Sequence, residues 1–435
     1  KKGSKSAPQN YRPVSLTSAV CKTMERLIRN RIVDHLEEHK LLLQTQHGFV
    51  KGKSCLTNLL SFLEDVTRAV DEGEPVDVLY LDFAKAFDKV PHQRLLKKLE
   101  AHAVDDRTCK WIGNWLKDRK QKVVIAGESS DEVDVLSGVP QGSVLGPTLF
   151  TIFINDLDHY VSSQLVKFAD DTKVYRRLKN PQNGELLQQD INNLCRWSKE
   201  WKMTFNVDKC SVMHIGFNNP QYEYEMDGKK LKSTDMEKDL GIYISKDLQP
   251  SNHCTAAVKK ANQSLGIMRR NIESRSPNVL LRLYKSIVRP HLEYAVQAWA
   301  PWMKKDIELV ESVQRRFTRM ITGMQDLSYE ERLARLRLRS LEARRRRGDA
   351  IQTLKILKRI DNVDPESFFE VDTQGRSRGH QLKLRKQYCR LDVRKHFYTQ
   401  RCIDTWNKLP PSAIEAATVL QFKKNITKEA AFKGY

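Results

Sequence analysis

Two acidic sites in this sequence have the residue types and the setting that metal-dependent chemistry needs. Asp170 and Asp171 separate two short apolar runs in residues 165–175, and this pattern predicts a hairpin that presents both carboxylates at its turn. Asp82 follows the β-rich run at residues 76–81, as a ligand does when a buried strand delivers it at its tip. Such carboxylates suit hard cations like Mg²⁺, which bind one or two of them together with substrate phosphates. An Asp-Asp turn alone is more often plain turn chemistry, so Asp82 is what favours a metal site.

The elements that must position these acids follow from the spacing of apolar residues. Helical spacing and β-rich runs alternate along the first 250 residues, and helical spacing dominates the rest. Helices are expected at residues 19–43, 56–70, 95–99, 111–116, 148–157, 186–201, 256–271, 277–288, 306–321 and 330–360. Strands are expected at residues 76–82, 122–125, 132–136, 165–175 (as two arms), 211–215 and 239–244.

Two glycine-bearing loops are the remaining candidates for contact with a ligand. In residues 46–54, Lys51 and Lys53 flank Gly52, which is equally compatible with a phosphate cradle and with a solvated loop. Residues 137–147 combine three glycines and two prolines with almost no charge. A loop of that composition brings its backbone close to something flat or bulky.

Composition and charge limit the class of protein. With 435 residues and 40% hydrophobic content, the chain can bury two to four subdomain cores. The net charge of +21 is uneven, because residues 1–250 carry +2 and residues 251–435 carry +19. A surplus of this sign favours a phosphate-binding surface, with a solvated helix face as the alternative. The basic C-terminal part therefore predicts a nucleic-acid partner.

The chain gives no support for secretion or for a membrane partner. It opens on Lys1 without a Met, has no apolar signal core, and has no run of about 18 apolar residues. The missing Met suggests a fragment. Its eight cysteines include no C-x-x-C pair, which favours a reducing intracellular compartment and packing thiols.

Several motifs in fixed order give the chain a family resemblance. They are Tyr11-Arg-Pro-Val-Ser-Leu16, Gln46-His-Gly-Phe49, Asp82-Phe-Ala-Lys-Ala-Phe-Asp88, Ser137-Gly-Val-Pro-Gln-Gly-Ser143, Phe168-Ala-Asp-Asp171, residues 206–209 and Leu240-Gly241. Together they resemble the reverse transcriptases of non-LTR (LINE-type) retrotransposons, of the jockey and chicken-repeat branch. The resemblance covers nearly the whole chain, and the C-terminal blocks at residues 289–294, 376–380 and 406–410 also fit this branch.

The resemblance implies an α+β right-hand polymerase with fingers, a palm built on an antiparallel sheet, a helical thumb and a basic, mainly helical C-terminal extension. The expected parts are N-terminally truncated fingers at residues 1–75, a palm with the catalytic motifs and primer grip at residues 76–245, a thumb at residues 246–325, and a nucleic-acid-binding region at residues 326–435.

It also implies RNA-directed DNA synthesis with two Mg²⁺ ions, or Mn²⁺ in their place, bound by Asp82, Asp170 and Asp171. Lys209 resembles the cation that protonates the leaving pyrophosphate. Asp82 and Asp170 are the expected bridging ligands, and Asp171 matches the last position of the family motif with a supporting role as the alternative.

Binding roles follow by position in the same motifs. Phe87 resembles the steric gate that excludes a ribose 2′-hydroxyl, and the cation Arg12 resembles a grip on the triphosphate. The residues expected to bind the nucleotide are Arg12, Phe83, Phe87, Gln141 and Gly142. The residues expected to bind nucleic acid are Leu240 and Gly241, as the primer grip, and Arg344, Arg345, Arg346 and Arg347. The family often has Arg or Thr where this chain has Val50, which puts one fingers contact in doubt.

The implied partners are template RNA, a DNA primer or nicked target DNA, and dNTPs, in target-primed reverse transcription by a ribonucleoprotein of the nucleus and cytoplasm. The alternative is an inactive nucleic-acid-binding remnant of such an element. An RNA-dependent RNA polymerase is disfavoured by Phe87, since RNA synthesis must admit the 2′-hydroxyl.

Overall fold

The chain folds into two compact units. The computed structural model describes residues 11, 13–125, 127–372, 379–429 and 432. The first unit comprises the described part of residues 1–50 together with residues 77–212 and 220–233, and the second comprises residues 51–76, 213–219 and 234–435. Among the described residues no helix is both long and apolar enough to cross a membrane.

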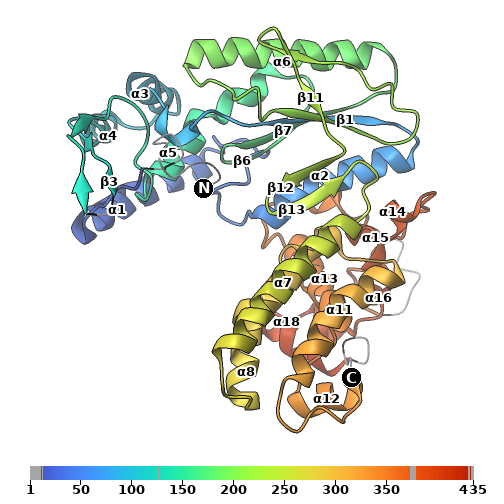
Figure 1. Ribbon diagram of the computed structural model, residues 1–435. Coiled ribbons are helices and arrows are strands. Elements are labelled where there is room, and N and C mark those ends of the chain that lie inside the picture. The colour runs from blue at the N-terminus through green and yellow to red at the C-terminus, as the bar shows by residue number, and fades with distance from the viewer. Residues whose placement is uncertain (1–10, 12, 126, 373–378, 430–431, 433–435) are drawn as a thin grey trace. The chain divides into compact units, whose positions relative to one another are not determined.

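A five-stranded sheet lies at the centre of the first unit (Figure 1). Its strands are, in spatial order, β11 (Lys232–Ser233), β8 (Ser211–Ile215), β1 (Val76–Leu81), β7 (Asp171–Arg177) and β6 (Gln164–Phe168). All six residues of β1 are buried, as its β-rich run predicts for a central strand. β6 and β7 are antiparallel, with Phe168 opposite Asp171, so the predicted aspartate hairpin is confirmed.

Helices cover this sheet and extend from one end of it. They are α1 (Ala19–Glu38), α3 (His92–Ala101), α4 (Asp106–Leu116), α5 (Gly146–Phe153) and α6 (Gln182–Trp201), with 3-10 turns η2 (Ala86–Asp88) and η3 (Asn155–Tyr160). Figure 1 shows α6 running across one face of the sheet. Leu187, Ile191, Leu194 and Trp197 of α6 are buried, so this side of the helix belongs to the core.

Short two-stranded ladders complete the first unit. β2 (Lys120–Gln121) pairs with β5 (Val133–Asp134), β3 (Val124–Ile125) pairs with β4 (Glu128–Ser129), and β9 (Glu225–Met226) pairs with β10 (Lys229–Lys230). The first two ladders fall close to the strands expected at residues 122–125 and 132–136, and their residues are exposed on both faces.

The second unit is mainly helical, with one hairpin of β12 (Met236–Asp239) and β13 (Ile242–Ser245). Its helices α7 (Ser251–Asn271), α11 (Lys304–Arg319) and α13 (Leu341–Leu357) pack in that order, α7 on α11 and α11 on α13. Its helices are α2 (Cys55–Asp71), α7 (Ser251–Asn271), α8 (Pro277–Leu283), α9 (Arg289–Glu293), α10 (Val296–Trp299), α11 (Lys304–Arg319), α12 (Tyr329–Leu336), α13 (Leu341–Leu357), α14 (Asp392–Lys395), α15 (Tyr398–Arg401), α16 (Ile403–Asn407), α17 (Pro411–Ile414) and α18 (Val419–Asn425), with η4 (Tyr284–Val288, a π turn), η5 (Pro365–Ser367) and η6 (Ile426–Lys428).

Helix α2 is held by the C-terminal part of the same unit. The carboxylate of Glu64 is buried and accepts hydrogen bonds from Arg394 Nη2 at 2.6 Å and Thr399 Oγ1 at 2.6 Å. Asp71 accepts from the backbone N–H of Leu391 at 2.7 Å. The four-part division of the chain stays a prediction, but α2, expected among the fingers, clusters with the C-terminal unit.

Two expectations about elements are wrong. The helix expected at residues 330–360 is two helices, because Arg337 ends α12 in a left-handed conformation and Ser340 caps α13. The strand expected at residues 239–244 is a hairpin whose two turn residues, Leu240 and Gly241, both have positive φ (43° and 91°). Such two-residue turns match the twist of the strands they join.

Candidate active site

Asp82 is the first residue after β1, and its backbone is fixed on both sides. The carbonyl of Asp82 accepts the N–H of Asn206 at 2.7 Å, and its N–H faces the Sγ of Cys210 at 3.4 Å. Burial raises the pKa of the Cys210 thiol to about 11, so this thiol stays protonated at neutral pH. The Asp82 side chain is 39% exposed and lies 3.2 Å from the Nζ of Lys209. The fold therefore brings together Asp82 and Lys209, two residues that were expected separately at the catalytic site.

The hairpin turn presents the second pair of acids. Asp170 is half-buried and Asp171 is exposed, whereas the next four residues of β7 are buried. Ala169, immediately before them, has φ +54°, a left-handed conformation that alanine seldom adopts. β7 is the neighbour of β1 in the sheet, so the hairpin belongs to a strand adjacent to the one that ends at Asp82.

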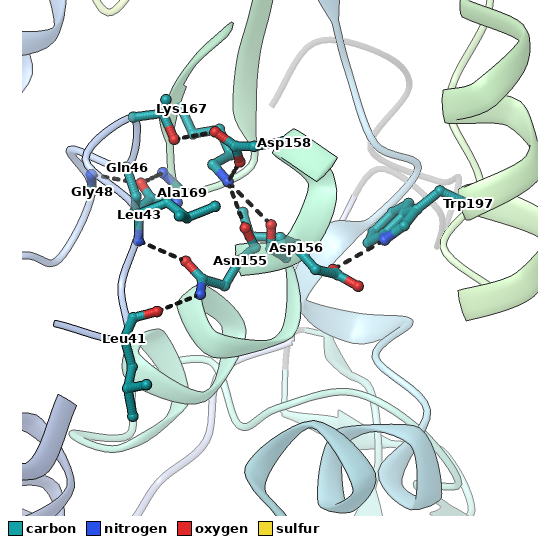
Figure 2. A network of polar contacts seen from close by, with 12 residues as sticks. Leu41, Leu43, Gln46, Gly48, Asn155, Asp156, Asp158, Lys167, Ala169 and Trp197 are labelled. Atoms are coloured by element: carbon teal, nitrogen blue, oxygen red, sulfur yellow. Dashed lines mark hydrogen bonds and ion pairs between the residues drawn. The ribbon is translucent and has the colours of Figure 1, made fainter. Parts of the chain in front are cut away.

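A buried polar network connects β6, the first strand of the hairpin, to η3 and the residue before it (Figure 2). The ammonium of Lys167 in β6 is fully buried, contacts the carboxylate of Asp158, and donates to the carbonyls of Ile154 and Asn155 at 3.3 and 3.2 Å. Thr45 donates its hydroxyl to the same carboxylate. Burial lowers the pKa of Lys167, and the charge of Asp158 opposes that shift.

The acids fit a hard divalent cation in ligand type. They are carboxylates at strand ends, at least partly accessible, and Mg²⁺ prefers such oxygen ligands completed by substrate phosphates and water. In the part of the chain that the structure describes, no three His, Cys, Asp or Glu side chains gather closely enough to hold a metal by themselves. A metal bound here would need water and substrate phosphates to supply its remaining oxygen ligands.

Phe87 lies in η2 between two other aromatic rings. Its ring stacks on that of Phe150 with centroids 4.4 Å apart, and the ring of Phe49 meets it edge-on at 6.4 Å. Phe87 is half-buried, so one part of its ring remains accessible. Contacts with two neighbouring rings restrict the rotation of the Phe87 side chain.

The glycine-rich loop at residues 137–143 is attached to the same segment. Gln141 Nε2 donates to Asp88 Oδ1 at 2.6 Å, and the N–H of Val139 donates to the carbonyl of Phe87 at 2.8 Å. Gly138 has φ +91°, and a Cβ there would lie 2.6 Å from the carbonyl oxygen of Asp88, so the close approach requires glycine. The loop brings its backbone close to the Phe87 segment of the protein, with Gly142 exposed.

Burial limits what Phe83, one of the residues expected to bind the nucleotide, can contribute. Phe83 is 4% exposed and stacks on Phe205 with centroids 4.5 Å apart, so its side chain is core and leaves only its backbone for a nucleotide. Arg12 lies outside the described residues.

The expected primer grip is the β12–β13 turn of the second unit. The hydroxyl of Tyr294 donates to the carbonyl of Leu240 at 2.9 Å, and a Cβ on Gly241 would lie 3.2 Å from the Tyr294 ring. Tyr294 therefore supports both turn residues. Burial raises the pKa of Tyr294, which keeps the hydroxyl a donor.

The arginine run of α13 is only partly exposed, and the burial of Arg345 corrects the prediction that all four arginines face nucleic acid. Arg344 forms a two-point ion pair with Glu293, and Arg347 Nη2 donates to the carbonyl of Lys423 at 2.9 Å. Arg345 is 5% exposed and cannot reach a phosphate from that position. Arg346 is the exposed member, 3.8 Å from Glu342 one turn earlier.

Three residues with clear structural roles at these sites went unrecognised in the sequence. Gln46 bonds the backbone beside the aspartate turn, Glu25 accepts the N–H groups of Val144 and Leu145 at the start of α5, and Tyr294 supports the grip turn. Gln46 and Tyr294 stand inside recognised motifs, which was the available signal. Glu25 is an ordinary helix glutamate in the sequence and gave none.

Comparison with known proteins places the chain in a family. A profile of the reverse transcriptase (RNA-dependent DNA polymerase) family matches residues 1–256. The chain is 29% identical over 329 residues to the probable RNA-directed DNA polymerase from transposon X-element of Drosophila melanogaster, covering 73% of this chain and 36% of that protein. It is 28% identical over 385 residues to the RNA-directed DNA polymerase from mobile element jockey of the same organism, covering 82% and 40%.

The chain thus spans less than half the length of these curated relatives. Among solved structures, apo telomerase from Candida tropicalis is 12% identical with a TM-score of 0.42, covering 69% of this chain and 50% of that one. The transposon relatives confirm the expected LINE-type resemblance. Because the family profile covers more than half of its residues, the chain belongs to the reverse transcriptase family.

Proposed function

We propose that this chain is the polymerase part of a LINE-type reverse transcriptase, which extends a DNA 3′-hydroxyl on an RNA template with dNTPs. The observation that carries the proposal is the placement of Asp82 and of the Asp170–Asp171 turn at the ends of neighbouring strands of one sheet. The names of the relatives, RNA-directed DNA polymerases of transposons, support the same activity.

Asp82, Asp170 and Asp171 would hold two Mg²⁺ ions, or Mn²⁺, with Asp82 and Asp170 as the bridging ligands. The bound ions would supply Lewis-acid stabilisation of the attacking 3′-hydroxyl and of the leaving pyrophosphate. Lys209, 3.2 Å from Asp82, would donate a proton to the pyrophosphate. The fixed backbone of Asp82 supports this role, because catalytic geometry tolerates little movement of a ligand.

Phe87 would select deoxyribonucleotides by filling the space of a 2′-hydroxyl. Its packing against Phe150 supports this role, since a gate must resist displacement. Gln141 and Gly142 would pack on the incoming nucleotide and template, and Arg12 would bind the triphosphate. Removal of the ring in Phe87→Val is expected to raise ribonucleotide incorporation, measured as the ratio of dNTP to rNTP efficiency.

The right-hand division into fingers, palm and thumb is part of the proposal, with the β12–β13 turn at Leu240 and Gly241 as the primer grip. The surplus of +19 in residues 251–435 supports contact with template RNA and with a DNA primer or nicked target DNA. The proposal further includes assembly into a ribonucleoprotein of the nucleus and cytoplasm.

Primer extension tests the proposal. The protein is incubated with poly(rA)/oligo(dT), Mg²⁺ and either dTTP or rUTP, and a parallel binding assay uses the same template–primer. Extension with dTTP that depends on Mg²⁺ is the expected result. Equal use of rUTP would favour an RNA polymerase, and tight binding without extension would favour an inactive remnant.

A further inference from the structure

The segment Thr45–Phe49 is attached to the outer edge of the sheet, beside β6. The N–H of Lys167 donates to the carbonyl of Thr45 at 2.9 Å, and the N–H of His47 donates to the carbonyl of Lys167 at 2.8 Å. Gln46 thereby forms a parallel bridge with Lys167, three residues before Asp170. The sheet edge next to the aspartate turn is therefore closed by this segment.

The side chain of Gln46 reaches the turn itself. It is fully buried, and its Oε1 accepts the N–H of Gly48 at 2.8 Å and the N–H of Ala169 at 3.0 Å. Ala169 is the left-handed residue immediately before Asp170. A left-handed alanine persists only where its surroundings hold it, and the Gln46 oxygen is one of the groups that hold it.

Two further observations show that this contact is built around the oxygen. The Nε2 of Gln46 is buried and has no hydrogen-bond partner in the described part of the chain. An unpaired buried donor lowers stability, so the hydrogen bonds of this side chain all involve its oxygen. A Cβ on Gly48 would lie 2.3 Å from the nitrogen of Ala169, so only glycine lets the segment approach this closely.

The segment is also anchored on its other side. Thr45 and Lys167 both contact the carboxylate of Asp158, and the N–H of Leu43 donates to Asn155 Oδ1 at 3.0 Å (Figure 2). A residue that positions a ligand must itself be held in place. The segment that carries Gln46 is held by these contacts with η3.

We propose that Gln46 is a positioning residue for the metal-binding carboxylate Asp170. Its Oε1 fixes the left-handed backbone at Ala169 and thereby the direction in which Asp170 leaves the sheet. The inference rests on the proposed role of Asp170 as a metal ligand. Mutation of a group that orients the ligand of a metal typically changes metal affinity by roughly 10- to 100-fold.

The test compares variants that differ in the acceptor oxygen. Gln46→Met keeps the length and removes the acceptor, Gln46→Asn keeps the amide but is one carbon too short to reach Ala169, and Gln46→Glu keeps the oxygen. Gln44→Met is the matched control, because Gln44 lies two residues earlier and is exposed. Mn²⁺ binding to the complex with template–primer is measured by electron paramagnetic resonance, alongside the Mg²⁺ dependence of primer extension and thermal unfolding.

We expect Gln46→Met and Gln46→Asn to weaken Mn²⁺ binding by about tenfold and to raise the Mg²⁺ requirement in parallel. Gln46→Glu and Gln44→Met should bind Mn²⁺ within about threefold of the unaltered protein, because both keep the oxygen at residue 46. Because two variants lose the contact with Ala169, the inference stays testable if one of them fails to fold. Unchanged Mn²⁺ affinity in a folded Gln46→Met or Gln46→Asn protein would overturn it.

Asp170→Asn separates this inference from the proposed function. If Asp170→Asn loses Mn²⁺ binding while the Gln46 variants keep it, the positioning role alone is wrong. If Asp170→Asn itself binds Mn²⁺ normally, the metal-ligand assignment fails and the positioning role fails with it.

Discussion

The aspartate turn of the first unit and the arginine run of the second both contain several charged residues. They differ in which of these residues are buried and which are accessible. At the turn, the buried charge belongs to Lys167, and Asp171 remains at the surface. In α13, Arg344 and Arg345 are themselves the buried or paired groups, and Arg346 is left outside. In the first case the internal charges hold a turn whose acids stay accessible.

The difference shows that a run of like charges does not identify a binding surface. A buried cation that contacts a carboxylate acts within the fold, and only the charges left accessible can contact a substrate. We therefore expect the removal of a charged side chain to have different effects in the two environments. Changes at the exposed acids should remove activity, whereas changes at the buried cations should remove stability.

The largest effect is expected from Asp82→Asn and Asp170→Asn. Each removes a proposed metal ligand, so the rate of primer extension should fall by at least about 100-fold. Template–primer affinity should stay within about twofold, because it derives mainly from the basic surface. Retention of more than about a tenth of the rate by either variant would contradict the assignment of these acids as metal ligands.

The second prediction concerns Lys167, the buried cation of β6. Lys167→Met leaves the carboxylate of Asp158 without its cation and should lower the free energy of unfolding by about 3 to 5 kcal/mol, measured by urea denaturation. The double variant Lys167→Met/Asp158→Asn should recover part of the loss. Lys199→Met is the control, because its ion pair with Asp227 is exposed and should leave the midpoint unchanged. Equal midpoints for Lys167→Met and Lys199→Met would contradict the comparison.

The third prediction is a pH dependence in the second unit. Burial, with a smaller contribution from Lys260, lowers the pKa of His253 from 6.5 to about 4, and its Nδ1 accepts the N–H of Tyr243 at 3.1 Å. The unfolded chain therefore binds this proton at a higher pH than the folded one. The stabilisation is complete above pH 6.5 and should be lost as the pH falls towards 4, by about 3 kcal/mol in all.

Stability measured between pH 4 and 7 checks this dependence. His253→Gln keeps an acceptor side chain but does not titrate, so its stability should vary less with pH over that range. His291→Gln is the matched control, because His291 is exposed, and it should keep the full dependence. An identical pH dependence in the two variants would show that the destabilisation originates at other groups.

The smallest effect is expected in the arginine run. Arg346→Gln should reduce the log–log salt slope of RNA binding by roughly 0.7 to 0.9, the value for one phosphate contact. Arg345→Met should leave that slope unchanged and lower the thermal midpoint, because Arg345 is buried. A change of slope in Arg345→Met would mean that this arginine reaches RNA after all.

Local patterns predicted the parts of the site that depend on neighbours in sequence. Two apolar runs around an acidic pair were enough for the hairpin, and a β-rich run was enough for β1. The break between α12 and α13 also had a local signal, the serine cap at Ser340, but the leucine periodicity across it suggested one helix.

Contacts between distant segments could not be predicted. Gln46 meets Ala169 across 123 residues of chain, and no spacing rule connects a loop glutamine to that turn. The burial of Arg345 likewise depends on how the second unit packs around α13, whereas its sequence neighbourhood is that of an exposed basic patch. The resemblance supplied the roles of the acids, and packing decided which charges stay accessible.

The contacts of Glu64 have a consequence for synthesis on the ribosome. Its partners Arg394 and Thr399 follow it by 330 and 335 residues. At 5 to 20 residues per second, α2 emerges roughly 15 to 70 s before the chain that neutralises its buried carboxylate. The packing around Glu64 can therefore be completed only after residues 394–399 have been translated, and until then the face of α2 that this part of the chain covers stays open.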